Sequence, residues 1–345
     1  MKALIFEGPN RMNVKDVASP ELQDGDLLLK VKACLICGTD IRIYEGRKTK
    51  DVRMPSILGH EFSGVVAETG SKIDRFKVGD FISVAPVIPC LTCYSCKHGY
   101  ENLCLNRTAF GYEYDGAFAE FVRIPKVAVK AGIVYHVSGE IPFEYLALAE
   151  PIACCINGQR NSQIKFRDTV VIIGAGPIGF VHILLAKASG AGTVICSEPN
   201  GIRRNLAKKI GADIVVDPKV EDLSEIVMNH SKGMGADVVI MAIGNPSIVN
   251  QTIDLVRKRG TVNFFAGFSV GDMPSVDVNK IHYKEIQITG TSASTRKDHE
   301  LALNLIENKI IDVSELLSYR YSLKNAVEAF SMAKRGEGMK VAIVP

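Results

Sequence analysis

The sequence lacks several features that would place the protein in a special class. None of its apolar runs approaches the length of a membrane span, and the first residues, MKALIFEGPN, do not have the layout of a signal peptide. The formal net charge of +3 is small for 345 residues, which argues against binding to nucleic acid or to an anionic membrane. There is no internal repeat and no low-complexity segment. We therefore expect a globular protein of the cytoplasm, with neither a membrane nor a nucleic acid as partner.

The composition is ordinary for a folded protein of this length. Hydrophobic residues make up 47% and charged residues 23% of the chain, which predicts two domains with ample apolar core. The nine cysteines are odd in number and mostly clustered. That distribution fits metal ligation in a reducing compartment better than a disulfide framework.

The segment from Asp168 to Glu198 carries the strongest single pattern. A β-branched run at Val170–Ile173 has the character of a buried parallel strand, and glycines at 174, 176 and 179 follow it as G-x-G-x-x-G. Apolar residues then recur at helical spacing, a second β-branched run begins at Thr193, and an acid closes the segment. This order is the fingerprint of a dinucleotide-binding unit.

Each glycine of this turn has a physical reason. Gly174 makes the tight turn, Gly176 lets a pyrophosphate approach the backbone, and Gly179 allows helix and strand to pack closely. The helix N-terminus offers N–H groups and a positive dipole end to the phosphates. Glu198 lies where a carboxylate would bond the adenosine ribose and repel a 2′-phosphate, which predicts NAD rather than NADP. The contacts predicted here are Gly174, Gly176, Pro177, Ile178, Gly179 and Glu198. A glycine-rich turn without a ligand is the alternative, which the agreement of strand, helix and acid disfavours.

From about 153 to 289, strand-like runs alternate with helical segments. The runs predict the six strands of a doubly wound parallel sheet, an α/β fold of Rossmann type, at 170–173, 193–195, 214–216, 238–241, 262–265 and 286–289. Ligands lie outside the carboxyl ends of such strands, so the ends of the later strands should line the nicotinamide side. Two helices at 299–308 and 323–335 and a last strand at 340–344 are expected beyond this region.

Residues 1 to about 150 are predicted to be mostly β, with strand-like segments at 2–6, 26–33, 62–69 and 81–86. Cys90, Cys93, Cys96 and Cys104 form a C-x2-C-x2-C-x7-C run in this region. Four thiolates in one loop fit a saturated tetrahedral zinc site of the structural kind. An iron–sulfur cluster is the alternative, because the spacing is near that of a ferredoxin loop. We favour zinc, because the last cysteine is more distant than in that loop and is followed by Leu105 instead of proline.

A second group of metal-ligand residue types is dispersed along the chain. It consists of Cys37, His60, Glu61 and Glu150. Taken singly, each has an ordinary explanation: a histidine in a turn is usually hydrogen-bonded, and Glu150 could be a solvated charge before a helix. Composition alone does not favour metal binding by these residues.

In combination, several segments resemble the zinc-dependent medium-chain alcohol dehydrogenase superfamily. They are CGTD at 37–40, GHEFSGVV at 59–66, VGD at 78–80, the four-cysteine loop, GAFAEFV at 116–122, AEP at 149–151 and GAGPIG at 174–179. The resemblance covers essentially the whole chain. The glutamates at 61 and 150 and the SEP segment at 197–199 look most like the polyol (sorbitol-type) and threonine dehydrogenase branch, because the ethanol-oxidising branch would show a cysteine ligand near 150.

The resemblance implies a fold, two metal sites and an oligomer. A discontinuous, mostly β, GroES-like catalytic domain would comprise 1–152 and 290–345, and the NAD-binding Rossmann domain 153–289. Two Zn2+ ions per chain are implied. The catalytic one would use Cys37, His60, Glu61 and Glu150, either glutamate exchanging with water, and the structural one Cys90, Cys93, Cys96 and Cys104. Such a site accepts the substrate oxygen at an open position. Relatives are homodimers or homotetramers.

The proton path is less complete than in many relatives. Thr39 aligns with the hydroxyl residue that in the family hydrogen-bonds the substrate alcohol, and a helix N-cap is its alternative role. Many relatives carry a histidine three residues later, where this chain has Arg42. A guanidinium cannot shuttle a proton at neutral pH. Arg42 is therefore expected either to hold an anionic or hydroxyl-rich substrate or to form a surface salt bridge.

The resemblance also places further cofactor contacts. Arg203 aligns with a residue that reaches the adenosine ribose in threonine dehydrogenases, whereas Arg204 is expected to face solvent. Backbone contacts to the nicotinamide side are implied at Ala266, Gly267, Phe268, Thr291 and Ser292, with Ala242 adjoining them.

The sequence thus predicts an NAD-dependent zinc dehydrogenase that oxidises a small secondary alcohol, a polyol or sugar derivative, to a ketone. An L-threonine 3-dehydrogenase is the nearest alternative, and the missing histidine at position 42 counts against it. A protein that binds zinc and NAD without catalysis is a third hypothesis.

Overall fold

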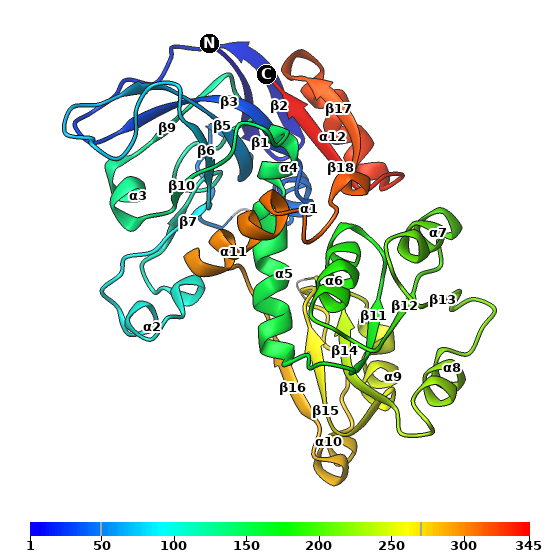
Figure 1. Ribbon diagram of the computed structural model, residues 1–345. Coiled ribbons are helices and arrows are strands. Elements are labelled where there is room, and N and C mark those ends of the chain that lie inside the picture. Colours follow the sequence, from blue (N-terminus) through cyan, green and yellow to red (C-terminus); the bar gives the residue numbers. More distant parts are fainter. Residues whose placement is uncertain (49, 270) are drawn as a thin grey trace. The chain divides into compact units, whose positions relative to one another are not determined.

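The computed structural model describes residues 1–48, 50–269 and 271–345. The chain divides into two compact units (Figure 1). Unit 1 comprises Met1–Ala153 and Ser294–Pro345, and unit 2 comprises Cys154–Ala293. The boundaries between the two domains predicted from the sequence lie after residues 152 and 289. In the part of the chain that the structure describes, no helix is both long enough and apolar enough to cross a membrane.

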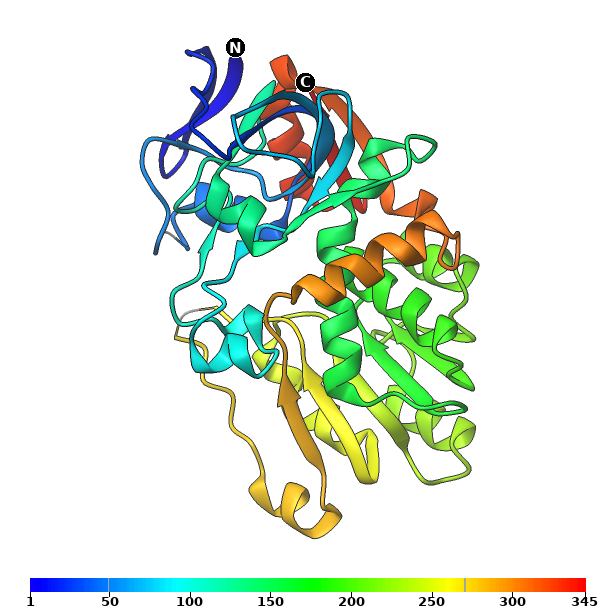
Figure 2. The same ribbon diagram turned by 60° about the vertical axis from the view of Figure 1, so that its left-hand side comes forward.

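Unit 2 is built on a parallel sheet of six strands. The strands are β11 (Thr169–Ile173), β12 (Thr193–Ser197), β13 (Ile214–Val216), β14 (Ala236–Met241), β15 (Val256–Phe264) and β16 (Gln287–Gly290). Their order across the sheet is β13-β12-β11-β14-β15-β16, which is 3-2-1-4-5-6 when counted from β11. The predicted doubly wound fold is therefore confirmed. In Figure 2 the gold strand β16 forms one outer edge of this sheet.

Helices cover both faces of this sheet. Because side chains alternate along a strand, Val170 and Ile172 pack on one face with α6 (Pro177–Ala188) and α7 (Gly201–Lys209). Val171 and Ile173 pack on the other face with α8 (Leu223–His230) and α9 (Val249–Asp254). This double coverage explains the continuous apolar runs in the sequence. The 3-10 turn η2 (Pro246–Ile248) and helix α10 (Val278–Lys284) complete the unit.

Unit 1 is mostly β, as predicted. Its largest sheet has the order β10-β6-β5-β3-β18-β17, with β9 also paired to β3. These strands are β3 (Leu27–Leu35), β5 (Glu61–Thr69), β6 (Phe81–Val84), β9 (Phe121–Ile124), β10 (Val134–His136), β17 (Leu317–Ser322) and β18 (Lys340–Val344). Smaller sheets join β1 (Lys2–Gly8) to β2 (Arg11–Asp16) and β4 (Ser56–Ile57), and β7 (Val87–Ile88) to β8 (Thr108–Ala109). Phe6, Phe62, Phe110 and Phe118 are fully buried in its core.

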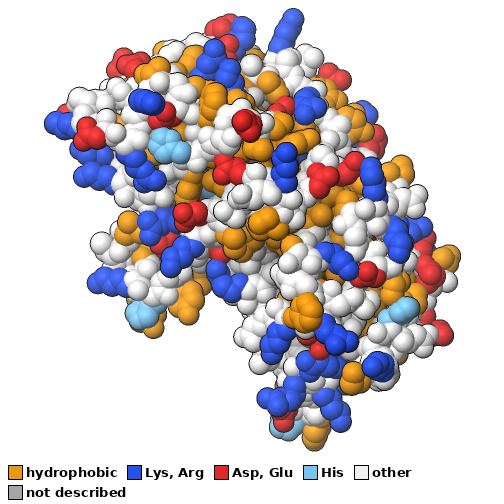
Figure 3. Space-filling view, in the orientation of Figure 1, with side chains coloured by type: hydrophobic (Ala, Val, Ile, Leu, Met, Phe, Trp, Pro, Cys, Tyr) orange, Lys and Arg blue, Asp and Glu red, His pale blue; other side chains and the backbone are white. Residues whose placement is uncertain are grey.

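The helices of unit 1 are short and lie mainly at the ends of strands. They are α1 (Gly38–Tyr44), α2 (Tyr94–Lys97), η1 (Glu101–Leu103), α3 (Lys126–Ala131), α4 (Phe143–Ala147), α11 (Arg296–Glu307), η3 (Ser314–Leu316), η4 (Leu323–Asn325) and α12 (Ala326–Arg335). Helix α5 (Ala149–Ser162) contains the point where unit 1 passes into unit 2. On the face drawn in Figure 3, basic and acidic side chains are intermingled, as the small net charge leads one to expect.

Candidate metal and dinucleotide sites

Two paired strands bring the first group of metal-ligand residues together. Strands β3 and β5 run antiparallel with Leu35 opposite Glu61, so the end of β3 lies beside the start of β5. Cys37 follows β3 as the N-cap of α1, and His60 immediately precedes β5. The ligand atoms of Cys37, His60 and Glu61 lie within 4.8 Å of one another. That spacing fits a single metal ion held by sulfur, nitrogen and oxygen.

The glycine before His60 fixes how the chain enters this group. Gly59 has a φ of +95°, and an added Cβ would lie 2.7 Å from the sulfur of Cys34. Cys34 itself is fully buried, and burial raises the pKa of its thiol well above the usual value. Cys34 is therefore a residue of the hydrophobic core.

An acid that the sequence analysis did not single out lies against this group. One oxygen of Asp40 accepts a hydrogen bond from the backbone N–H of Cys37 at 2.9 Å, and the other lies 3.4 Å from Nδ1 of His60. Burial alone would lower the pKa of His60, but the charges of Asp40 and Cys37 outweigh it and raise the pKa well above the usual value. The field at this position thus favours a cation.

Glu61 forms a buried ion pair with a residue from the far end of the chain. The ammonium of Lys340 lies 2.5 and 2.6 Å from the two carboxylate oxygens of Glu61, and both side chains are at most 6% exposed. Burial would lower the pKa of Lys340, but the charges of Glu61, Cys37 and Glu150 raise it above the usual value. Lys340 therefore keeps its positive charge beside the Glu61 carboxylate.

Glu150 is positioned differently from the other three predicted ligands. It lies in the first turn of α5, and its carboxylate is outside the group whose atoms converge within 4.8 Å. It is near enough for its charge to act on Lys340. Three of the four predicted catalytic ligands are thus brought together.

Thr39 and Arg42 contact each other beside this group. The N-cap of α1 is Cys37, so the N-cap role considered for Thr39 is wrong. The guanidinium of Arg42 donates a hydrogen bond of 3.1 Å to the hydroxyl oxygen of Thr39. None of the described carboxylates forms an ion pair with Arg42, so the salt-bridge alternative is wrong as well. The hydroxyl hydrogen of Thr39 is left available to another acceptor.

The four cysteines of the second group lie close together in the loop that contains α2 and η1. The sulfur atoms of Cys90, Cys93, Cys96 and Cys104 lie within 4.8 Å of one another, with separations of 4.0 Å (Cys90 to Cys96) and 3.9 Å (Cys93 to Cys104). Four ligands about 2.3 Å from a tetrahedral zinc would lie about 3.8 Å apart. These dimensions fit one ion and leave no room for a cluster of several iron atoms. Hydrogen bonds from Thr92 and from the N–H of Cys93 lower the pKa of Cys90 to about 5, which favours the thiolate that a metal needs.

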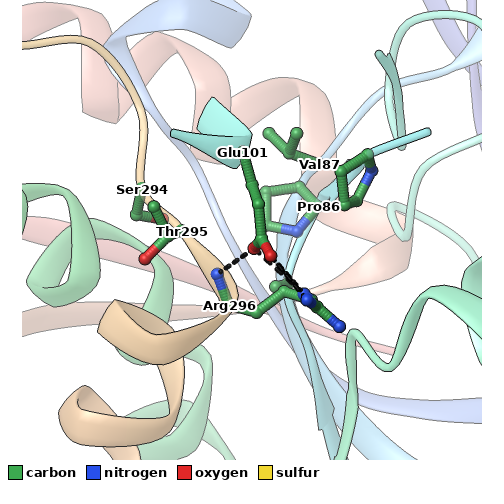
Figure 4. Close-up of a pocket in the computed structure, with 8 residues that line it drawn as sticks. Pro86, Val87, Glu101, Ser294, Thr295 and Arg296 are labelled. Carbon is green, nitrogen blue, oxygen red and sulfur yellow. Dashed lines mark hydrogen bonds and ion pairs between the residues drawn. The ribbon is translucent and has the colours of Figure 1, made fainter. Parts of the chain in front are cut away.

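A salt bridge ties this cysteine loop to α11 (Figure 4). Glu101 lies between Cys96 and Cys104, and its carboxylate faces Arg296, whose Nε lies 2.9 and 3.0 Å from the two oxygens. Burial would raise the pKa of Glu101, but Arg296 lowers it below the usual value. Arg296 also donates to the carbonyl of Ala131 at 2.7 Å. The contact fixes the loop on the body of unit 1.

The glycine turn of unit 2 has the geometry that its sequence predicts. Gly174 has a φ of +95°, and a Cβ on Gly179 would lie 1.8 Å from the carbonyl oxygen of Gly174, so helix α6 and strand β11 are in close contact. Around Gly176 the nearest atom to an added Cβ is 3.9 Å away, in the guanidinium of Arg203. Packing within the chain therefore does not require glycine at 176, whereas the approach of a ligand would.

The acid at the end of β12 lies against this turn. The carboxylate of Glu198 accepts hydrogen bonds from the backbone N–H groups of Ala175 at 2.7 Å and Asn200 at 2.9 Å. Asn200, Ile202 and Lys219 line a shallow hollow beside it, with Pro199 and Gly201. Arg204 was predicted to face solvent, but its side chain is only 21% exposed. Its guanidinium forms an ion pair with Asp217 at 2.9 Å and donates a hydrogen bond to the carbonyl oxygen of Glu198.

The other predicted cofactor contacts follow the carboxyl ends of neighbouring strands. Ala242 follows β14, residues 266–268 follow β15, and Thr291 and Ser292 follow β16. The N–H of Ala266 donates to Met241, and the hydroxyl of Thr291 lies 3.2 Å from the amide nitrogen of Asn263. In a parallel sheet these ends share one edge with the glycine turn after β11. Pro177 and Ile178 open α6 at the same edge.

Comparison with known proteins shows which proteins the chain is similar to. One family model, described as an alcohol dehydrogenase GroES-like domain, matches residues 23–132, and another, described as a zinc-binding dehydrogenase, matches residues 177–308. L-threonine 3-dehydrogenase of Pyrococcus furiosus is 35% identical over 334 residues, 95% of this chain and 94% of that protein. D-arabitol-phosphate dehydrogenase of Enterococcus avium is 33% identical over 348 residues, 99% of this chain and 97% of that protein. A zinc-binding dehydrogenase of Sinorhizobium meliloti 1021, solved with NADP, is 34% identical with a TM-score of 0.93, over 100% of this chain and 99% of that one.

Proposed function

Because the chain belongs to the zinc-dependent medium-chain alcohol dehydrogenase superfamily, in its polyol and threonine dehydrogenase branch, we propose that it oxidises a secondary alcohol to a ketone with NAD. The substrate is a polyol or sugar derivative. The observation that carries the proposal is the convergence of Cys37, His60 and Glu61 beside the Thr39 hydroxyl, in a chain whose unit 2 has a dinucleotide-binding turn. Unit 1 is the zinc domain and unit 2 the NAD domain.

The catalytic zinc would be held by Cys37 and His60 with a glutamate, Glu61 or Glu150. The donor types and their spacing fit zinc, and Asp40 beside His60 is the kind of carboxylate that orients a metal-binding imidazole. A zinc ion in this place supplies Lewis acidity that polarises the substrate oxygen. Because Lys340 binds both oxygens of Glu61, the exchange of glutamates requires that this ion pair open.

The Thr39 hydroxyl receives the proton of the alcohol. One lone pair of its oxygen accepts from Arg42, and the other is free to accept from the substrate, while its own hydrogen passes to water. Arg42 cannot take the proton, because its guanidinium is always protonated. Its positive charge instead stabilises negative charge that develops on the Thr39 oxygen as the proton moves. The residue that replaces the histidine of many relatives thus supports the relay electrostatically.

A second zinc would be held by the four cysteines, giving two per chain. The sulfur separations support this assignment. NAD would lie on the glycine turn, with Arg203 near its phosphates and adenosine ribose, and the carboxylate of Glu198 would disfavour a 2′-phosphate. The relative solved with NADP makes the ratio of activities with the two cofactors a direct test.

The experiment is a metal and substrate survey of the purified protein. We expect two zinc ions per chain and reduction of NAD with polyols such as sorbitol, xylitol and arabitol. Cys37→Ser should abolish turnover while NAD still binds, and Cys34→Ala, three residues earlier and in the core, should keep activity. Full activity after complete removal of the metal would refute the mechanism. Light scattering would test the expected dimer or tetramer.

L-threonine 3-dehydrogenase is a second candidate, favoured by the 35% identity to the Pyrococcus furiosus enzyme. Assaying L-threonine beside the polyols separates the two. Full zinc content and NAD binding without turnover on any alcohol would instead support a non-catalytic protein.

A further inference from the structure

Among the described residues, two basic side chains beside the candidate catalytic metal site, Arg42 and Lys48, have no carboxylate partner. Arg47 is paired with Glu45, and Arg53 with Asp115 at 2.6 Å. No ion pair within the described residues neutralises Arg42 or Lys48. A charged group that remains unpaired close to a reaction centre is a candidate for binding a charged substrate.

Contacts connect both cations to the metal group. Arg42 donates to Thr39 at 3.1 Å, and its Nε is buried with no hydrogen-bond partner among the described residues. Lys48 donates its ammonium to the hydroxyl of Tyr112 at 2.9 Å, and the ring of Tyr112 lies 6.3 Å from that of His60. The backbone of Lys48 in turn donates to the carbonyl of Arg42 at 3.2 Å.

We infer that the substrate alcohol carries a phosphate ester, held by Arg42 and Lys48; this rests on the proposed dehydrogenase function. The planar fork of Arg42 can bind two phosphate oxygens, and Lys48 supplies a mobile point charge at the exposed rim. The buried Nε of Arg42 would then gain an acceptor.

The charge balance separates this substrate from the alternatives. A phosphate monoester carries about −1.5 to −2 charges at neutral pH, which matches two cations. A carboxylate carries one charge and would leave one cation unmatched. L-threonine brings an ammonium group with its carboxylate, so its net charge is zero, and a neutral polyol gains only hydrogen bonds. A phosphorylated polyol fits best.

The test compares three probes that share one carbon chain: D-arabitol 1-phosphate, D-arabitol and D-arabinonate. We expect a kcat/KM for the phosphate about 100-fold above that for the neutral polyol, and each of Arg42→Gln and Lys48→Gln to reduce this ratio about 10-fold or more. The ratio cancels general damage to the site. Arg47→Gln, at a paired and exposed cation on the same loop, should leave it unchanged.

Calorimetric titration of the zinc-loaded protein with the same probes tests the inference without turnover. Binding of arabitol phosphate that weakens in both variants supports it even if NAD is never reduced, in which case the proposed function fails alone. Oxidation of arabitol or arabinonate as efficiently as the phosphate would overturn the inference and leave the proposed function standing. An effect of Arg42→Gln confined to the KM for NAD would also overturn it, because Arg42 would then serve the cofactor.

Discussion

Replacing His182 with leucine should make the protein less sensitive to acid. His182 lies in α6, is fully buried, and neither ring nitrogen has a hydrogen-bond partner among the described residues. Its ring meets that of Phe265 edge-on, with centroids 4.6 Å apart. Burial lowers the pKa of His182 to about 3, so the folded protein keeps it neutral where the unfolded chain takes up a proton.

The magnitude follows from the two protonation states. Below the ordinary pKa of 6.5 the unfolded state binds the additional proton, so the free energy of unfolding falls by about 1.4 kcal/mol for each pH unit until about pH 3. At pH 5 the loss from His182 is about 2 kcal/mol, and above pH 7 it vanishes. His182→Leu removes this term and two unpaired polar atoms, so it should unfold at higher urea concentration at pH 5 than the parent protein does.

The assay is urea unfolding followed by circular dichroism at pH 5, 6 and 7. The difference between variant and parent should grow on acidification by about 2 kcal/mol in total between pH 7 and pH 5, and its slope should approach about 1.4 kcal/mol per pH unit only below about pH 6. His230→Gln, at an exposed helix end, is the matched control and should leave the pH dependence unchanged. Parallel curves for His182→Leu and the parent would refute the reasoning, since they would mean that His182 titrates alike in both states.

Three further outcomes follow from other contacts. Lys340→Met should lower the free energy of unfolding by about 3–5 kcal/mol in urea titrations, because Glu61 is left buried without its counter-charge, and adding Glu61→Gln should recover part of the loss. Gly176→Val should fold with an unchanged Tm but lose NAD binding by fluorescence titration, whereas Gly179→Ala should lower the Tm, because its Cβ would meet the Gly174 carbonyl. Glu101→Gln should cost about 1 kcal/mol at pH 7 and progressively less in acid: the lowered pKa of Glu101 means that its contribution is present above 4.5 and is lost as pH falls through the folded value.

The parallel sheet of unit 2 could be predicted because its information is local. Each strand is a β-branched run followed by a turn, and the spacing from Gly174 to Glu198 fixes the dinucleotide motif. The main departure is β15, which begins at Val256 instead of 262. Its first residues, VRKRG, are polar and include Arg259 with a φ of +56°, where the register with β14 shifts, so neither composition nor alternation marks them as strand.

The metal site could be predicted only in part because its contacts are distant in sequence. The family motifs mark Cys37, His60 and Glu61, and the structure brings them together. Nothing near Lys340 in the sequence indicates that it neutralises Glu61, since the two are 279 residues apart. Asp40 was visible in the CGTD motif, but only the pairing of β3 with β5 shows that its second oxygen meets His60.

The pairing of β18 with β3 also dictates the order in which the molecule can assemble. Unit 2 is one uninterrupted stretch, so it can complete its sheet while the ribosome is still translating the codons that follow. Unit 1 must wait for β18, which brings Lys340 to Glu61. Until that strand emerges, one edge of β3 is unpaired in the nascent chain. Loss of the C-terminal segment would therefore leave unit 1 incomplete while unit 2 could still fold, and a chaperone that binds unpaired strands would bind unit 1.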